Sequence, residues 1–242
     1  MCSSDLFTRA MSEIEPEEFF RRVLLGLLGA RAITVGANFR FGHGQAGGTT
    51  QLARLAAEAG VAMEVVPLLK RRGVTVSSSE IRRLLAAGKV SKAGRLLDRP
   101  YSLTGSVVPG AGRGSRLTVP TLNLETGSLD DAARALPLEG VYITRTACLA
   151  SERRWESITN IGRRPTFDGR SLTIETFLLS PFDGETPKAI RIEFLRWVRE
   201  ERRFESAEAL RAQILRDVAR AMGFFGRLRR IRKGSGAITW AR

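Results

Sequence analysis

The pattern of apolar residues changes near residue 99, and this change limits what the chain can fold into. Before that point, apolar residues recur three and four positions apart, as in 19–28 and 52–59, which is typical of amphipathic helices. After it, short β-branched runs such as 103–108 and 141–146 alternate with Gly, Pro and Asp, which favours antiparallel strands. The sequence therefore predicts a mixed α/β part followed by an all-β part.

The first part has the spacing of a β-α-β unit. We predict a helix after Pro16, a strand over 32–35, a glycine-bracketed loop over 36–44, a helix capped by Thr49 or Thr50 and a strand over 61–69. Two more helices are predicted, one opened by Ser77–Ser79 and one ending near Leu97. Two strands are fewer than a parallel sheet needs to cover both faces. We therefore expect part of this α/β region to be missing and an apolar edge to be exposed.

The second part is predicted to form a sandwich or a barrel followed by one helix. Its predicted strands are 103–108, 117–124, 141–146, 171–179 and 190–194. The final helix is capped near Ser206 and carries four apolar residues expected to pack on the sheet: Leu210, Ile214, Leu215 and Val218.

Charge and residue counts narrow the function classes. Lys and Arg number 39 against 25 Asp and Glu, a formal charge of +14, which suits either nucleic acid or polyanionic nucleotides as ligands. The arginines are spread along the chain, and only 227–233 forms a cluster, so a solvated arginine-rich surface is favoured over nucleic-acid binding, which is the second choice. One histidine and two cysteines exclude multi-histidine metal sites and a disulfide framework. No apolar run of about 20 residues and no signal pattern is present, so we expect a cytoplasmic protein without a membrane partner.

A glycine-rich segment lies between two predicted strands. Backbone N–H groups of Gly110, Gly112 and Gly114 could approach a phosphate, and Arg113 and Arg116 add positive charge. A mobile hairpin is the alternative, and the segment taken alone favours it.

Two strand positions carry candidate chemistry. Thr121 and Asn123 are two residues apart and so share one face of their strand. Their neutral oxygens suit Mg²⁺, although the spacing alone favours ordinary strand polarity. Glu175 is a carboxylate in an apolar, β-branched strand, where an unpaired charge is costly. It either pairs with an arginine or serves as a general base for an alcohol substrate.

Several motifs occur together in a diagnostic order. They are the Gly110–Gly114 loop, Pro120-Thr-Leu-Asn123, Gly140-Val-Tyr142, Asn160-Ile-Gly-Arg-Arg-Pro-Thr-Phe167, Glu175 and Arg199-Glu-Glu-Arg-Arg-Phe204. In this order, over about residues 99 to 225, the chain resembles riboflavin kinase, specifically the C-terminal half of the bacterial bifunctional riboflavin kinase/FMN adenylyltransferase (FAD synthetase) family. The resemblance implies a six-stranded antiparallel Greek-key β-barrel with a C-terminal helix. It also implies transfer of the ATP γ-phosphate to the riboflavin 5′-hydroxyl, which gives FMN.

The resemblance also implies roles for individual residues. It implies that Thr121 and Asn123 hold Mg²⁺ and the nucleotide, that Glu175 is the catalytic base, and that the Gly110–Gly114 segment, with Arg116, covers the ATP phosphates. Arg199 and Phe204 match the segment near the flavin. The chain departs from the family at Thr118-Val119, where Gly-Phe is common, and at Phe177, where a histidine is common.

The N-terminal part resembles the adenylyltransferase half of the same family, a Rossmann-like nucleotidyltransferase domain of which only a later portion is expected. The motifs are 35–42 and 76–82, and the matching residues are Gly36, Asn38, Phe39, Arg40, Ser78, Ser79 and Arg82. The His-x-Gly-His motif that binds ATP phosphates in this family is absent, Asn38 replaces a usual Asp, and His43 lies in a different motif. We therefore predict that this chain makes FMN but not FAD.

The resulting organisation has three segments. Residues 7–98 are predicted to be the partial adenylyltransferase domain, 99–226 the riboflavin kinase domain and 227–242 a basic tail. Expected ligands are ATP, riboflavin and Mg²⁺, with no nucleic acid. The alternatives are a flavin- or nucleotide-binding protein without catalysis and a basic nucleic-acid-binding protein.

Overall fold

A computed structural model gives the fold of the chain, which divides into two compact units, Met1–Val76 and Ser77–Arg242. The structure describes residues 8–109, 121–127, 135–166, 169–180, 185–202 and 204–234. Residues 77–98 lie within the second unit, so their packing links them to the all-β part of the chain. The domain boundary that the change in sequence pattern predicts near residue 98 stays a prediction.

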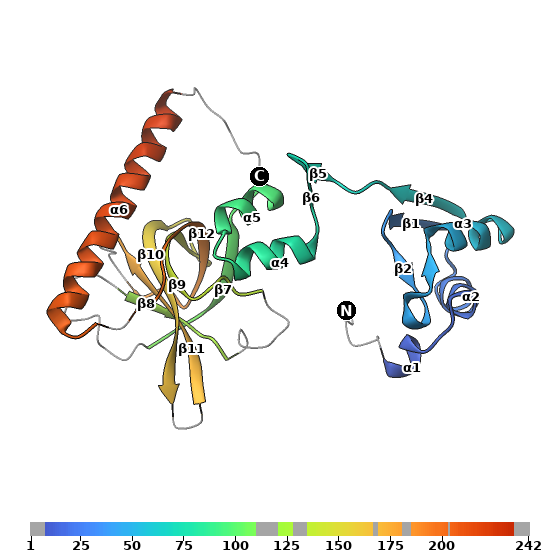
Figure 1. The fold of residues 1–242 in the computed structure, drawn as a ribbon, viewed down its shortest axis with the longest axis horizontal. Helices are drawn as coiled ribbons and strands as arrows, with labels where there is room; N and C mark the ends of the chain where they lie inside the picture. The colour runs from blue at the N-terminus through green and yellow to red at the C-terminus, as the bar shows by residue number, and fades with distance from the viewer. Residues whose placement is uncertain are drawn as a thin grey trace. The chain divides into compact units, whose positions relative to one another are not determined.

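The first unit is built on the predicted β-α-β arrangement (Figure 1). Strands β1 (Ala32–Gly36) and β4 (Ala62–Val66) are parallel and in register, and helix α3 (Thr49–Glu58) connects them. Two short hairpins accompany them, β2 (Arg40–Phe41) with β3 (Gly47–Gly48), and β5 (Lys70–Arg71) with β6 (Val74–Thr75). Helix α1 (Arg9–Ser12) and the single turn η3 (His43–Gln45) also belong to this unit.

Several local features of this unit differ from the sequence expectation. The helix after Pro16 begins as α2 (Pro16–Glu18) and continues as a π-helix, η2 (Phe19–Leu27). Gly48, not a threonine, is the N-cap residue of α3, so the predicted cap was wrong by one or two positions. Strand β4 ends at Val66, because the chain then leaves its partner β1 and turns into the β5–β6 hairpin.

The second unit begins with the two predicted helices, α4 (Ser78–Ala86) and α5 (Val90–Leu97). The Ser77 side chain accepts a hydrogen bond of 3.2 Å from the backbone N–H of Glu80, which confirms the predicted cap. Leu85 and Val90 are fully buried in the same apolar cluster as the strands that follow. These helices are therefore part of the packing of the all-β region.

Six strands close into an antiparallel barrel with the order β10-β11-β8-β7-β12-β9. They are β7 (Tyr101–Val108), β8 (Thr121–Leu124), β9 (Gly140–Cys148), β10 (Arg154–Thr166), β11 (Gly169–Leu178) and β12 (Ala189–Arg199). Strands β9, β10 and β11 are sequential neighbours, whereas β8 returns beside β11 and β12 beside β9, which is Greek-key topology. The six-stranded barrel is confirmed, although the sequence-predicted strands did not include β10.

A ring of buried hydroxyl groups lies inside the barrel. Thr144, Ser157, Thr146, Thr176 and Thr159 are fully buried, and successive pairs in this order form hydrogen bonds of 2.8–3.3 Å that close on Thr144. Each hydroxyl can donate to one neighbour and accept from the other, so the ring satisfies five polar groups without water. The ring joins β9, β10 and β11, and it fits only one register of these strands.

Helix α6 (Ala207–Gly234) covers the outer face of β9 and β10. Its Ala221 and Phe225 are buried against Val141, Ile143 and Ile158. Of the four apolar residues expected at this contact, Ile214 and Val218 are half-buried, whereas Leu210 and Leu215 are 39% and 60% exposed, so for these two the prediction was wrong. The Ser206 hydroxyl accepts a hydrogen bond from the Ala209 N–H, which confirms the predicted cap.

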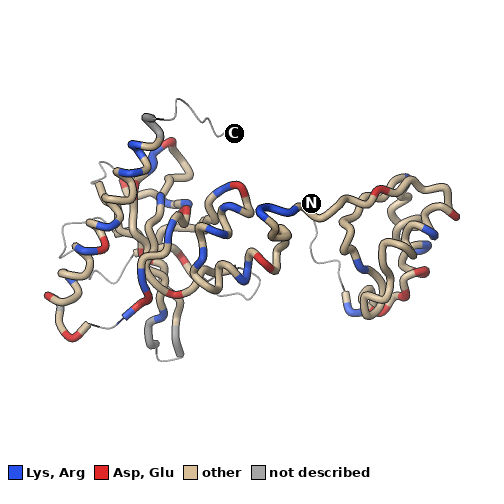
Figure 2. The backbone as a smooth tube through the Cα atoms, turned by 45° about the horizontal axis from the view of Figure 1, so that its top comes forward, with Lys and Arg blue, Asp and Glu red and all other residues tan. Residues whose placement is uncertain are grey.

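The described elements also show where the positive charge lies and whether a helix could cross a membrane. Lys and Arg are distributed over both units, and several lie along α6, which continues through the first part of the segment expected to be a basic tail (Figure 2). In the described part of the chain, no helix is both long and apolar enough to cross a membrane.

Candidate functional site

Three polar residues form a row on the outer face of the barrel. In the strand register Asn123 of β8 lies opposite Glu175 of β11, and Glu175 lies opposite Asn160 of β10. Directly opposed residues of antiparallel strands have Cβ atoms about 4.5–5.5 Å apart and point to the same side. A carboxylate thus lies between two carboxamides, on the face opposite the buried hydroxyl ring.

The alternation within β8 follows the predicted pattern. Leu122 and Leu124 are each 2% exposed in the core, whereas Thr121 and Asn123 are half-buried on the outer face. Thr121 lies opposite Phe177 and Asn123 opposite Glu175. The two neutral oxygens predicted to share a face therefore share it with the carboxylate.

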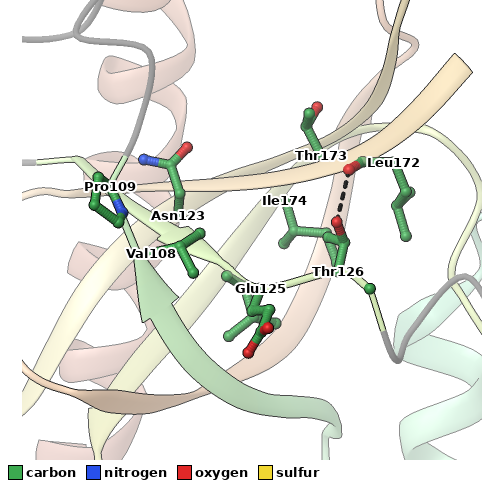
Figure 3. Close-up of a pocket in the computed structure, with 10 residues that line it drawn as sticks. Val108, Pro109, Asn123, Glu125, Thr126, Leu172, Thr173 and Ile174 are labelled. Atoms are coloured by element: carbon green, nitrogen blue, oxygen red, sulfur yellow. Dashed lines mark hydrogen bonds between the residues drawn. The ribbon is translucent and has the colours of Figure 1, made fainter. Parts of the chain in front are cut away.

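A pocket of about 290 Å³ opens beside this row. Asn123 lines it together with Val108 and Pro109 at the end of β7 and with Thr173 of β11 (Figure 3). Thr126 and Leu172 also line the pocket, and the Thr126 hydroxyl donates a 2.9 Å hydrogen bond to the Leu172 carbonyl. The candidate phosphate-binding residues Gly110, Gly112, Gly114 and Arg116 lie outside the described residues. The segment that contains them connects Pro109, in the pocket wall, to Thr121.

A second carboxylate approaches the row from the segment before α6. The Asn160 side-chain nitrogen donates a 3.2 Å hydrogen bond to the Glu201 carboxylate. That carboxylate lies over Gly162, where a Cβ atom would overlap both of its oxygens. Asn160 and Glu201 had not been assigned roles from the sequence, and the signal that could have drawn attention to them is the charged run 199–203 placed between a strand and a helix.

The candidate flavin-binding residues Arg199 and Phe204 lie close together. The Arg199 guanidinium forms a 2.9 Å ion pair with Asp217 of α6, whose side chain is 3% exposed. Its central carbon lies 5.7 Å from the centroid of the Phe204 ring, and that of Arg202 lies 4.9 Å from the same centroid. Arg199 is thus directed toward α6, and its role here is to anchor the segment that carries Glu201 and Phe204.

A glycine allows this segment to approach the barrel. A Cβ atom at Gly140 would lie 2.5 Å from the Arg199 carbonyl oxygen and 2.6 Å from the Trp197 ring. Because real Cβ contacts do not reach such distances, residue 140 has to be glycine for the end of β12 to lie across the start of β9. The Gly140-Val-Tyr142 motif therefore has a structural reason.

The residues matched to an adenylyltransferase are divided between the two units. Gly36 ends β1, Asn38 lies in the turn that follows, Phe39 comes directly after that turn, and Arg40 begins β2, all in the first unit. Ser78, Ser79 and Arg82 are exposed on α4 in the second unit. Within its own unit, Phe39 stacks on the buried Phe41 at 5.8 Å between ring centroids, so its role there is packing.

Comparison with protein-family models gives two matches. The riboflavin kinase model matches residues 97–225, which contain the whole row and the pocket, and the FAD synthetase model matches residues 3–80. A bifunctional riboflavin kinase/FMN adenylyltransferase from Pseudomonas fluorescens is 33% identical over 89% of this chain and 67% of its own length. The chain belongs to the riboflavin kinase/FMN adenylyltransferase family.

Other relatives carry the same description. The bifunctional enzyme of Escherichia coli K12 is 30% identical over 91% of this chain, and that of Bacillus subtilis is 29% identical over 93%. The chain spans about two thirds of the length of each of these relatives. A crystal structure described as a macrolide-efflux protein from Streptococcus pneumoniae shares the fold, with a TM-score of 0.73 and 24% identity over 87% of this chain and 66% of that one.

Proposed function

We propose that the barrel transfers the γ-phosphoryl group of ATP to the 5′-hydroxyl of riboflavin, giving FMN and ADP. The observation that carries this proposal is the row Asn123–Glu175–Asn160 beside the pocket, within the region matched by the riboflavin kinase model. Phosphoryl transfer depends mainly on positioning and on charge neutralisation. The rigid barrel supplies the positioning, the carboxylate supplies a base, and charge neutralisation would come from the cation that accompanies ATP.

Thr121 and Asn123 would hold the magnesium ion that accompanies ATP. Mg²⁺ binds oxygen ligands, keeps several waters and bridges to nucleotide phosphates, so two neutral protein oxygens on one face suit it. The half-buried positions of both side chains on the outer face are consistent with that ligand set. When bound, the ion neutralises negative charge on the transferring phosphates. The segment with Gly110, Gly112, Gly114 and Arg116, which joins the pocket to Thr121, would cover the phosphates.

Glu175 would act as the general base. As the 5′-oxygen of riboflavin forms its bond to the γ-phosphorus, the bond from that phosphorus to the β,γ-bridging oxygen breaks and ADP leaves. The proton of the hydroxyl passes to the Glu175 carboxylate. Its half-buried strand position, opposite Asn123 and Asn160, holds the carboxylate fixed between the nucleotide end and the acceptor end of the row.

The flavin would bind at the other end of the row, next to Phe204. Arg199 supports this end through its ion pair with Asp217 and its contact with the Phe204 ring. The Phe204 ring, held by its contacts with the Arg199 and Arg202 guanidinium groups, offers an apolar group against which a planar ring system can pack. We further propose that ATP and riboflavin are the ligands of a cytoplasmic enzyme, with no nucleic-acid partner.

FMN is proposed to be the only flavin nucleotide that this chain produces. The chain contains one histidine, His43, so it lacks the paired histidines that bind the ATP phosphates in the family's adenylyltransferase half. The His43 ring lies 3.3 Å from the Ser12 carbonyl oxygen. The residues matched to that half, Gly36 to Arg40 and Ser78 to Arg82, would then be remnants without a catalytic role in this chain.

One incubation tests these proposals together. The chain is mixed with riboflavin, ATP and Mg²⁺, and FMN and FAD are separated by chromatography. FMN alone is expected. FAD in addition would overturn the proposal for the N-terminal half, whereas bound riboflavin with no product would make the protein a flavin-binding protein without catalysis.

A further inference from the structure

The hydrogen bond between Asn160 and Glu201 determines how the Asn160 carboxamide is oriented. A carboxylate can only accept hydrogen bonds, so the group that faces Glu201 at 3.2 Å is the Asn160 NH₂. The Asn160 carbonyl oxygen is then directed away from Glu201. Asn160 lies opposite Glu175. In this orientation the carboxamide therefore offers a hydrogen-bond acceptor, its carbonyl oxygen, on the side of Glu175 where the alcohol would bind.

Two features hold the Glu201 carboxylate at that place. The absence of a side chain at Gly162 leaves the space that its oxygens occupy. On both sides of Glu201 in sequence, arginines are bound to α6: Arg199 to Asp217, and Arg202 to the Gln213 side-chain oxygen. Asp217 and Gln213 are 2% and 5% exposed, so this anchor is part of the barrel–helix packing.

We infer that Glu201 is a positioning residue for the acceptor alcohol, an inference that rests on the proposed riboflavin kinase activity. It acts by keeping the Asn160 carbonyl oxygen directed toward a hydroxyl of the ribityl chain. With the carboxamide reversed, the Asn160 NH₂ group would take the place of that oxygen and could not accept a hydrogen bond from the hydroxyl. Glu201 therefore serves the positioning of the alcohol beside Glu175.

Gly162→Ala tests this inference without changing either partner of the hydrogen bond. The added methyl group would meet only the end of the Glu201 side chain among its nearest neighbours, which can swing away, so the fold should be retained. We expect G162A and E201A each to lower kcat/KM for riboflavin by about tenfold, the effect of losing one hydrogen bond that involves a charged group. The KM for ATP should stay unchanged, because Thr121 and Asn123 are not affected.

The conservative variant and a matched control complete the set. Glu201→Gln keeps an oxygen that can accept from Asn160, so most of the riboflavin kcat/KM should be retained. Glu200→Ala removes the neighbouring exposed carboxylate and should change neither kinetic constant. In the E201A background, G162A should have no further effect, because the group that it displaces is already gone.

The outcomes separate this inference from the function on which it rests. If the wild-type chain forms no FMN, the proposed function is wrong and this inference is wrong with it. If the wild type forms FMN and both G162A and E201A retain its kinetics for riboflavin, the inference alone is overturned. Additive losses in the double variant, or a rise in the KM for ATP, would also overturn it.

Discussion

The sheet of the second unit is closed into a barrel, whereas the parallel sheet of the first unit has two strands. In the second unit, six strands form a closed barrel, so every strand has hydrogen-bonded neighbours on both sides. In the first unit, β1 and β4 form a two-stranded parallel sheet, and Val65, Val66, Leu68 and Leu69 are more than 40% exposed there. Parallel strands are usually covered on both faces. A closed barrel holds its side chains more rigidly than a two-stranded sheet does. The comparison therefore predicts that the residues that carry out catalysis lie in the barrel.

The largest expected difference concerns catalysis. Glu175→Gln should lower kcat for FMN formation by about 10²–10⁴-fold, the range for loss of a general base, with riboflavin binding retained. Asn38→Ala, in the first unit, should leave FMN formation unchanged. Steady-state rates of the two variants measure this contrast.

Glu156→Gln is the matched control for the barrel, because Glu156 is also an outer-face carboxylate and pairs with Arg229 on the surface. A rate for E175Q close to that of E156Q would remove Glu175 from the mechanism. A large loss in N38A would show that the first unit takes part in the kinase reaction.

The next largest effect concerns stability. Phe194 in the barrel and Phe20 in the first unit are each 1% exposed, so replacing either with alanine should destabilise its own unit by about 3–5 kcal/mol. All three tryptophans, Trp155, Trp197 and Trp240, belong to the second unit. Denaturant unfolding followed by tryptophan fluorescence should therefore shift for F194A and not for F20A.

Circular dichroism, which reports both units, should detect the change in F20A. Equal shifts of the fluorescence transition in both variants would mean that the two units unfold together. The two units would then be separate in their packing but not in their unfolding.

A smaller effect is expected from the hydroxyl ring. Thr159→Val keeps the shape of the side chain but removes one hydroxyl, so Thr144 and Thr176 each lose one of their two ring hydrogen bonds and keep the bonds to Ser157 and Thr146. Each lost hydrogen bond costs about 0.5–1.5 kcal/mol, so the free energy of unfolding should fall by about 1–3 kcal/mol and the fluorescence midpoint should move to lower denaturant concentration. Thr104→Val, the same substitution at an exposed position of β7, is the control and should change the midpoint little.

The barrel was more predictable from the sequence than the site was. Alternation in 121–124 and 171–178 follows from strand geometry, so the shared face of Thr121 and Asn123 could be anticipated. The row that contains Glu175 could not, because it depends on which strands are neighbours, and β8 pairs with β11 rather than with the next strand. The role of Gly162 depends on a side chain 39 positions later in the sequence. In helix α6, periodicity identified a buried face but placed it too close to the N-terminus, because Phe225 rather than Leu215 reaches the barrel.

The smallest predicted effect is a loss of barrel stability at alkaline pH. The Tyr142 hydroxyl is buried, donates to the Leu138 carbonyl, and has its pKa raised by burial. A tyrosine whose pKa is higher in the folded state stabilises the fold fully below its unfolded pKa, and that stability is lost as the pH rises through about 10 and beyond. The free energy of unfolding of the barrel should therefore fall above that pH.

Tyr142→Phe provides the comparison, because phenylalanine cannot ionise. The variant should lose some stability at neutral pH through the missing hydrogen bond, but its free energy of unfolding should decline less as the pH rises. The first unit contains neither of the two tyrosines, so its unfolding should not show this decline. An identical alkaline decline in wild type and Y142F would exclude Tyr142 as the cause.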